Sequence, residues 1–215
     1  MIVYHGSDVI VEKPQFGFGK KTNDYGQGFY CTDDIELAKE WACKDLSGGF
    51  LNIYSLDIAG LNILRLDERN TLEWLALLLR NRTIRYSSPI EKKASDHIIN
   101  EFLPDIEPFD IIIGHRADDS YFSFARAFLS NTITLEQLSH SLKFGNLGLQ
   151  IFIKSAEAFE RLNFVESEAI DGESYYPRKA ARDDEAREKY DKLLETIDST
   201  GVYINDILKK GDNRS

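Results

Sequence analysis

The chain has 215 residues, 42% of them hydrophobic and 29% charged, which excludes a disordered or fibrous protein and allows a core of ordinary size. The formal net charge of −10 at pH 7 excludes a general nucleic-acid-binding protein, because backbone phosphates are bound by clustered Lys and Arg. A nucleic-acid substrate held in a local basic groove remains open.

The sequence indicates a reducing compartment. No basic segment followed by an apolar run stands at the N-terminus, so no signal peptide is expected. The apolar run 75–79 is far shorter than a membrane-spanning helix and is flanked by charged residues. Cys31 and Cys43 are the only cysteines. We therefore expect a cytoplasmic protein with reduced thiols and no membrane contact.

The beginning of the chain predicts two short strands and a helix, separated by a loop. The apolar run 2–4 ends at His5-Gly6-Ser7, whereas residues 8–22 lack a helical period and contain Pro and Gly. A glycine turn then leads into an aromatic strand, in the sequence Asp24-Tyr25-Gly26-Gln27-Gly28-Phe29-Tyr30-Cys31-Thr32. The helix that follows contains Trp41, and Thr32 or Asp33 is expected to cap it.

Further along the chain, strands and helices are interspersed. The clearest strand is Phe-Asp-Ile-Ile-Ile-Gly at 109–114, a β-branched run stopped by glycine. The other predicted elements, in order, are a strand at 51–58, helices at 70–80, 90–102, 120–129 and 135–142, a strand at 149–153, a helix at 155–162, a charge-dense helix at 178–196 and an amphipathic segment at 202–208.

The sequence changes character after Phe164, where it becomes acidic and polar. We therefore expect one domain over residues 1–165 and a helical C-terminal extension, residues 166–215, packed on it. A basic cluster is interpreted as solvated charge near the end of a helix; it consists of Arg80, Arg82, Arg85, Lys92 and Lys93.

The motifs near the N-terminus are informative in combination. A histidine at a strand end, such as His5, and a tyrosine after glycine, such as Tyr30, are each most often structural. Here, however, strand–His-Gly-Ser is followed by a long loop, by Gly-Gln-Gly-Phe-Tyr-Cys-Thr, and by Trp41 in a helix. This arrangement resembles the NAD-binding half of the ADP-ribosyltransferases with a histidine–tyrosine–glutamate triad, as in poly-ADP-ribose polymerases and diphtheria toxin.

The resemblance implies a role for each matching residue. His5 would bind a ribose hydroxyl, the Gly6 backbone would pair with the nicotinamide carboxamide, and Tyr30 and Trp41 would stack on the nicotinamide ring. Ser7 and Gly28 belong to the same NAD-binding segments. Stacking a pyridinium cation on an aromatic face is worth roughly 0.5–2 kcal/mol, and a glycine lets a backbone amide approach a ligand closely.

The whole chain also resembles a bacterial family of unknown function within the ADP-ribosyltransferase superfamily. This resemblance implies an α+β fold with a split, strongly bent β-sheet, surrounding helices, and the NAD cleft between the two halves of the sheet. It implies a toxin or phage-defence effector, with an antitoxin protein as a partner. It is carried by the two N-terminal motifs, 38–42, 110–114 with 117–119, Gln150, 158–164 and 182–190.

The third member of the triad departs from the pattern. The matching strand, residues 149–153, offers Gln150 where a glutamate normally grips the ribose 2′-hydroxyl and stabilises the oxocarbenium-like state. An amide accepts the same hydrogen bond but brings no charge, and charge is where transition-state stabilisation is largest.

Residues that follow the 109–114 strand are further candidates. Asp118 and Asp119 either act on the acceptor nucleophile or cap the next helix, and the sequence leaves both readings open. Arg116 is a candidate contact for the NAD phosphates. The spacing of His and Cys residues predicts no metal site.

We expect transfer of ADP-ribose from NAD, as substrate, to a protein or nucleic-acid acceptor, with release of nicotinamide. His5, Tyr30 and Gln150 would act on NAD, with Asp118 or Asp119 helping the acceptor. Two alternatives remain: hydrolysis of NAD, with water as the acceptor, and an inactive module that binds NAD or ADP-ribose.

Overall fold

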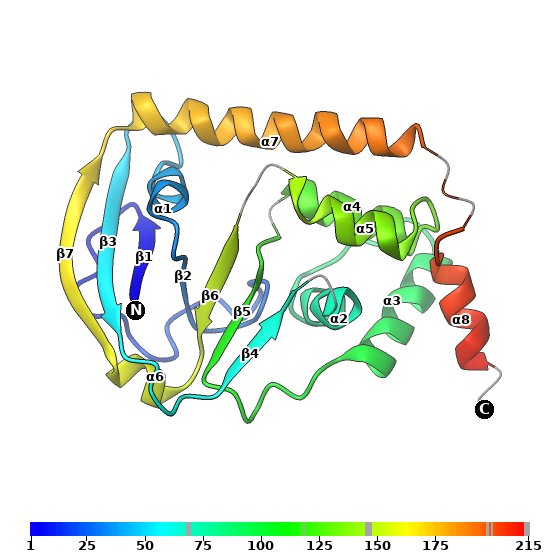
Figure 1. Ribbon diagram of the computed structural model, residues 1–215, viewed down its shortest axis with the longest axis horizontal. Helices are drawn as coiled ribbons and strands as arrows, with labels where there is room; N and C mark the ends of the chain where they lie inside the picture. Colours follow the sequence, from blue (N-terminus) through cyan, green and yellow to red (C-terminus); the bar gives the residue numbers. More distant parts are fainter. Residues whose placement is uncertain (68–69, 118, 145–147, 197, 199, 213–215) are drawn as a thin grey trace.

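The computed structural model describes residues 1–67, 70–117, 119–144, 148–196, 198 and 200–212, without the side chains of 119–121 and 210–212. These residues form a mixed α and β structure with two sheets (Figure 1). The elements, in chain order, are β1 (Ile2–Ser7), β2 (Phe29–Cys31), α1 (Ile35–Ala42), β3 (Gly49–Leu56), β4 (Ile63–Leu66), α2 (Thr71–Asn81), α3 (Pro89–Phe102), β5 (Ile111–His115), α4 (Asp119–Leu129), α5 (Leu135–Ser141), β6 (Leu149–Ile153), α6 (Ala156–Glu160), β7 (Leu162–Ile170), α7 (Gly172–Leu194) and α8 (Ile204–Asp212).

The two sheets differ in strand direction. The first has the order β1-β3-β7 and is antiparallel throughout. The second has the order β2-β6-β5-β4, in which only the β4–β5 pair is parallel. Within the described residues, an isolated β-bridge joins the two sheets: Tyr4 N donates to Thr32 O at 2.8 Å, and Thr32 N donates to Tyr4 O at 2.9 Å. This bridge places the middle of β1 beside the end of β2.

The strands form where apolar side chains are buried between the sheets. Val3 and Tyr54 from the first sheet pack with Ile111, Ile151 and Ile153 from the second, and each is at most 2% exposed. A larger apolar cluster fills the helical half of the molecule, around Trp74 of α2. Burying such side chains is the main favourable term in folding, at about 25 cal/mol per Å².

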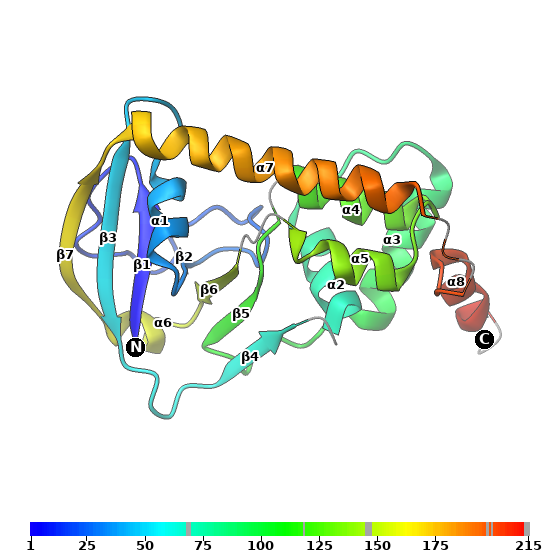
Figure 2. The same cartoon turned by 45° about the horizontal axis from the view of Figure 1, so that its top comes forward.

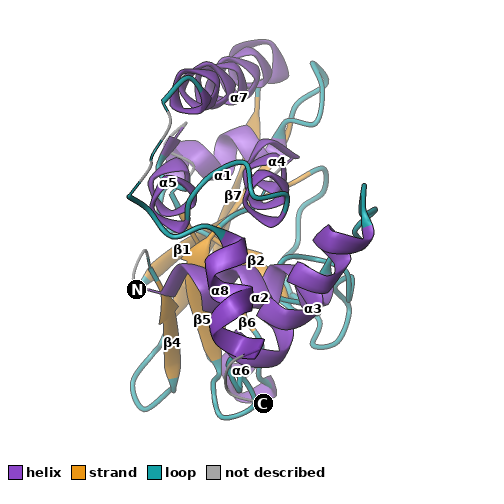
Figure 3. Cartoon of the chain, turned by 90° about the vertical axis from the view of Figure 1, so that its right-hand side faces the viewer, coloured by secondary structure: helices purple, strands orange, loops and turns teal. Residues whose placement is uncertain are grey.

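Helix α7 links the two halves of the molecule. It begins beside β7 and runs across the top to the helices on the other side (Figures 1 and 2). Glu40 of α1, only 4% exposed, accepts from Arg182 Nε at 2.9 Å and Nη2 at 2.7 Å, which fixes α7 to α1. The side view shows α7 above α4 and α5, with α8 below them (Figure 3). No helix in the described ranges is long and apolar enough to cross a membrane.

Several sequence expectations need correction. The predicted boundary between residues 165 and 166 falls inside β7, which pairs with β3 over residues 162–170, so the helical extension begins at Gly172 instead. Strand β4 was not expected. The cap of α1 is Asp34 rather than Thr32 or Asp33, since its carboxylate accepts from the backbone N–H groups of Glu36 and Leu37.

Candidate functional site

A cleft of about 620 Å³ opens where the two sheets meet α1 and α7. Its volume lies within the range of about 300–1,000 Å³ that is usual for ligand pockets. The residues that line it are His5, Gly6, Asn23, Asp24, Tyr30, Trp41, Lys44, Arg82, Arg116, Ala117, Gln150 and Lys179. The structure therefore brings together six of the residues that the sequence singles out, from positions 5 to 150.

His5 is held in one tautomer. Its Nδ1 lies 2.7 Å from the carbonyl oxygen of Tyr30, and because a carbonyl only accepts, Nδ1 carries the hydrogen. The ring also contacts Phe29, with centroids 4.4 Å apart. Burial lowers the pKa of His5 below its ordinary value of 6.5, although the Tyr30 carbonyl acts in the opposite direction. At neutral pH the ring is therefore uncharged, and Nε2 is an acceptor for a ligand.

Gly6 is required by packing as well as by the cleft. A Cβ at this position would lie 2.0 Å from the Ala38 carbonyl oxygen and 2.5 Å from the Ala42 nitrogen, both in the α1 backbone. No side chain fits there, so β1 approaches α1 closely and the Gly6 backbone reaches the cleft wall. A larger residue would displace α1 and, with it, Trp41.

Tyr30 has two structural attachments besides its place in the cleft. Its hydroxyl donates to Gly26 O at 2.7 Å and accepts from Tyr25 N at 3.1 Å, and its ring packs on Phe152 at 4.8 Å between centroids. Burial raises the pKa of the hydroxyl. Gly26 has a φ of +95°, a conformation that favours glycine. Tyr30 thus fixes the preceding turn.

The indole ring of Trp41 stacks on the guanidinium group of Arg116. The guanidinium carbon of Arg116 lies 4.5 Å from the centre of the indole ring. This is a cation–π contact of the kind that a pyridinium ring would make. Trp41 is therefore placed to stack on a flat cation, and a ligand would share the indole with Arg116 or displace it.

Gln150 is 4% exposed and is paired with a carboxylate that the sequence did not single out as a site residue. Its Nε2 donates to Asp24 Oδ2 at 3.0 Å and to His115 O at 3.3 Å. Both partners are acceptors, so the amide nitrogen must face them and Oε1 is available to a ligand. The backbone N–H of Ala117 donates to the same Asp24 oxygen at 2.9 Å.

Asp24 therefore places a negative charge beside Gln150, deep in the cleft. It is 7% exposed, and its other oxygen lies 3.6 Å from Nε of Arg82. The position is fixed further by Tyr25 and Trp74, whose hydroxyl and indole N–H donate to the His115 carbonyl at 2.6 and 3.0 Å. The cleft therefore contains an amide and a carboxylate side by side, supplied by Gln150 and Asp24.

The remaining wall of the cleft is basic. Of the residues that the structure describes, Lys44, Arg82, Arg116 and Lys179 line it, and Asp24 supplies a carboxylate. Such a lining favours a ligand with phosphate groups, even though the chain as a whole has a net charge of −10.

Other predicted site residues lie elsewhere. Ser7 does not line the cleft; its hydroxyl donates to Val9 O at 2.7 Å and accepts from Asn52 Nδ2 at 2.9 Å, which organises the following loop. Gly28 packs β2 on β6, since a Cβ there would lie 2.4 Å from the Phe152 ring. Asp118 lies outside the described residues. Of Asp119, the structure describes only that it begins α4.

The sequence analysis missed several residues that line the cleft, and they differ in whether the sequence contains a signal for them. Asp24 stands in the glycine motif before Tyr30, where an acidic residue close to a predicted ligand-binding tyrosine was a usable signal. Arg82 was predicted to be a solvated charge, together with Arg80 and Arg85. Those two neighbours are exposed, whereas Arg82 is half-buried. Lys179 comes from α7, and no local pattern connects it to the cleft.

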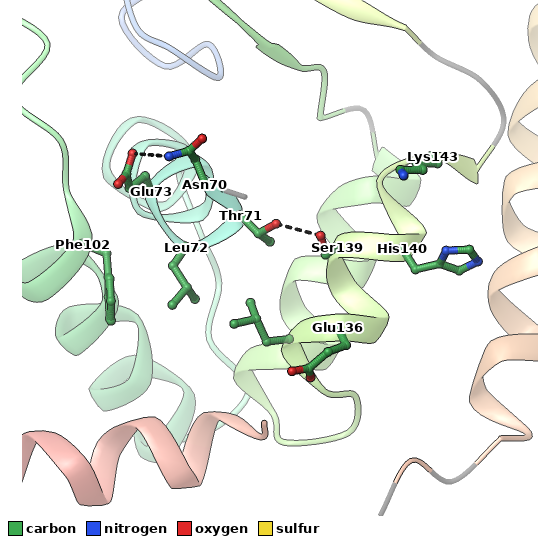
Figure 4. A pocket seen from close by; sticks show the side chains of 10 residues that line it. Asn70, Thr71, Leu72, Glu73, Phe102, Glu136, Ser139, His140 and Lys143 are labelled. Atoms are coloured by element: carbon green, nitrogen blue, oxygen red, sulfur yellow. Dashed lines mark hydrogen bonds between the residues drawn. The ribbon is translucent and has the colours of Figure 1, made fainter. Parts of the chain in front are cut away.

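A second cavity, of about 610 Å³, lies among the helices between the start of α2, α5 and Phe102 of α3 (Figure 4). Two pairs of its polar side chains are hydrogen-bonded: Thr71 Oγ1 donates to Ser139 Oγ at 3.0 Å, and Asn70 Nδ2 donates to Glu73 Oε2 at 3.3 Å (Figure 4). None of the residues that the sequence singled out for NAD lines it. We therefore place the candidate site in the cleft.

Comparisons with known proteins identify the chain at the level of a family. No curated protein and no solved structure matches it. Residues 1–164 match a family described as "Protein of unknown function (DUF3990)", and this span includes every residue that lines the cleft except Lys179. Since the match covers well over half of the 215 residues, the chain belongs to this family.

Proposed function

We propose that this protein is an ADP-ribosyltransferase that moves ADP-ribose from NAD to a macromolecular acceptor and releases nicotinamide. One observation carries the proposal. His5, Gly6, Tyr30, Trp41 and Gln150 line a single cleft whose remaining wall is basic. The aromatic rings suit the pyridinium ring of NAD, and the neutral histidine and the amide suit its ribose hydroxyls. The cations suit its diphosphate.

The proposed reaction breaks the bond between ribose C1′ and the nicotinamide nitrogen. Nicotinamide leaves with the bonding electron pair, and positive charge develops on the ribose. A lone pair of the acceptor then bonds to C1′, and the acceptor gives up its proton. Gln150 Oε1 accepts from the ribose 2′-hydroxyl, and the Asp24 carboxylate behind it stabilises the developing cation.

The proposal is tested with NAD labelled in the adenine moiety, incubated with the protein and a bacterial lysate. We expect label on a macromolecule, and digestion of the product with protease or nuclease identifies its class. Release of ADP-ribose alone would instead indicate an NAD hydrolase, and intact NAD with measurable binding would indicate an inactive module. Absence of both cleavage and binding would overturn the proposal.

His5 gives the activity a predictable pH dependence. If its neutral Nε2 must accept a ribose hydroxyl, NAD cleavage should be constant above pH 6.5 and fall below it, as the lowered pKa is crossed. The free energy of unfolding should fall in the same window, because the unfolded chain binds the proton at a higher pH than the folded chain does. Both pH profiles are measured on the same preparation.

His5→Ala is the variant for this prediction, and His140→Ala, at an exposed site, is its control. Loss of one hydrogen bond of about 1.4 kcal/mol lowers the rate about tenfold. The remaining rate of NAD cleavage by His5→Ala should no longer fall below pH 6.5, whereas the rate of the His140→Ala control should still fall there. An unchanged profile in His5→Ala would remove His5 from the mechanism.

The biological setting that the resemblance implies is part of the same proposal. A toxin or phage-defence effector of this kind acts inside a bacterial cell, in the cytoplasm, and an antitoxin protein neutralises it. This role depends on the transferase activity, so a variant without NAD cleavage should be harmless to a bacterial host that the parent protein arrests.

A further inference from the structure

We infer that the tip of the loop between β1 and β2, residues 13–22, binds single-stranded nucleic acid. The bound strand is the acceptor of the proposed reaction, and this role rests on the proposed transferase function. The tip has the sequence Lys-Pro-Gln-Phe-Gly-Phe-Gly-Lys-Lys-Thr, with three lysines, two phenylalanines and no acidic residue. The whole chain, by contrast, has 36 acidic and 26 basic residues.

The tip presents two aromatic rings to solvent. Phe18 is 83% exposed and Phe16 is 62% exposed. The ring of Phe159 supports Phe16 from one side, nearly perpendicular to it and with centroids 5.6 Å apart. Burial of such rings would stabilise the fold, so large apolar side chains kept at the surface mark a place of interaction.

The backbone is anchored on both sides of Phe18. On one side, Gln27 Nε2 donates to Gly17 O at 2.5 Å. On the other side, a Cβ on Gly19 would lie 2.5 Å from Gly28 O, so the two backbones are in close contact. An ordered backbone therefore holds the Phe18 ring outward, which reduces the conformational entropy lost when a ligand binds.

The lysines of the tip are available to phosphate groups. Lys13, Lys20 and Lys21 are exposed, and in the part of the chain that the structure describes no ion pair, hydrogen bond or aromatic ring engages their ammonium groups. Proteins hold single strands by stacking bases on aromatic rings and by placing cations on the phosphates. Two rings that are followed directly by two lysines supply both contacts.

The composition of the tip favours a nucleic acid over a lipid surface or an acidic protein. Binding to a membrane scales with buried apolar area, and Pro14 is the only apolar side chain of the tip besides the two phenylalanines. An acidic protein would pair with the lysines, but its carboxylates offer no flat face to the rings. Every nucleic-acid base has such a face.

The tip also leads directly into the cleft. Asn23, two residues after Lys21, lines the cleft. Thr22 lines a hollow of about 350 Å³ together with Arg82 and Phe122, and Arg82 lines the cleft as well. A strand bound at the tip therefore lies beside the space in which, under the proposed function, the acceptor attacks the ribose of NAD.

The test is binding of fluorescent single-stranded DNA and RNA of about 12 nucleotides, measured by anisotropy without NAD. We expect the parent to bind at least one of them, and the pair distinguishes DNA from RNA. Phe18→Ala should weaken binding about tenfold, because a stacking ring is lost. Phe18→Leu should weaken it almost as much, since leucine is apolar but not flat, whereas Phe18→Trp should bind like the parent. The exposed position makes unfolding by these changes unexpected.

The lysines are tested through the salt dependence. For single strands, each phosphate contact contributes about 0.7 to the slope of log K against log salt concentration, so Lys20→Ala/Lys21→Ala should lower that slope by about 1.4. The matched control is Lys189→Ala/Lys192→Ala, which makes the same charge change on α7, at side chains that are 49% and 69% exposed. Its affinity and slope should equal those of the parent.

Three results would overturn the inference: a parent that binds neither oligonucleotide, an equal loss in the lysine control, or parental oligonucleotide binding by Phe18→Leu. Binding to vesicles of phosphatidylserine and phosphatidylcholine, without oligonucleotide binding, would identify a membrane surface and overturn it too. Nuclease-resistant label on protein would overturn the role as acceptor. All these variants should retain NAD binding. Oligonucleotide binding without NAD binding or cleavage would overturn the proposed function and leave the nucleic-acid surface in place.

Discussion

Asp24→Asn is expected to lower the rate of NAD cleavage about 100- to 1,000-fold, the usual effect of removing one preorganised electrostatic group from a transition state. The substitution is conservative because the hydrogen bonds that the described residues donate to the Asp24 carboxylate, from Ala117 N and Gln150 Nε2, reach the same oxygen, Oδ2. An asparagine oxygen in that place keeps both bonds and removes only the charge. Single-turnover cleavage of NAD measures the effect.

The fold and NAD binding should survive this substitution. Arg82 loses a partner at 3.6 Å, but its side chain is 29% exposed, so the free energy of unfolding should fall by only about 1 kcal/mol. Asp33→Asn, at an exposed position outside the cleft, makes the same chemical change and should leave the rate unaltered. A parental rate in Asp24→Asn would mean that the charge beside Gln150 has no part in catalysis.

Gln150→Glu is expected to destabilise the folded protein, although it introduces the residue that the triad pattern normally contains. A carboxylate at this position would face Asp24 Oδ2 and the His115 carbonyl, both acceptors that now lie 3.0 and 3.3 Å from Nε2. Burying an unmatched charge lowers the free energy of unfolding by about 3–5 kcal/mol. Denaturant unfolding at several pH values measures this loss.

The pH dependence gives the physical cause. Two carboxylates this close share a proton, so one of them has a raised pKa in the folded state. The destabilisation should therefore grow as the pH rises through that pKa, and shrink in acid. A loss that does not vary with pH would indicate a packing defect.

The double variant Asp24→Asn/Gln150→Glu exchanges the amide and the carboxylate between the two positions. It should recover part of the stability that Gln150→Glu loses, because the amide introduced at position 24 can turn to donate to the new carboxylate, while the Ala117 N–H loses the oxygen that now accepts its hydrogen bond. The coupling between the two sites is the difference between the double variant and the sum of the single variants. Strict additivity would show that Asp24 and Gln150 do not interact.

Several elements could be predicted because local pattern and burial agree. Strand β6 has the predicted bounds, residues 149–153, and β5 overlaps the predicted strand at 109–114, since β-branched apolar runs of this length fit a sheet buried on both faces. Helix α2 likewise matches its strongly apolar sequence to within one residue.

The missed strands lack that agreement. Strand β4 is four residues long and too short to show a period. Most residues of β7 are exposed or half-buried, so their polar sequence carries no strand signal; their backbone bonds to β3 hold them in the sheet. Helix α7 begins at Gly172, before Pro177 and before the predicted start at residue 178, because the Asp171 carboxylate caps it by accepting from the backbone N–H groups of Glu173 and Ser174.

By itself, the sequence determined the residues of one wall of the cleft, because the motifs at His5 and Tyr30 are local and the strands that carry them are short and apolar. Only the tertiary structure decided that Asp24 stands behind Gln150 and that Lys179 closes the cleft. Asp24 and Gln150 are 126 positions apart. A buried hydrogen bond between such distant side chains leaves no periodic trace in either segment, since it depends on how the two sheets and α7 pack together.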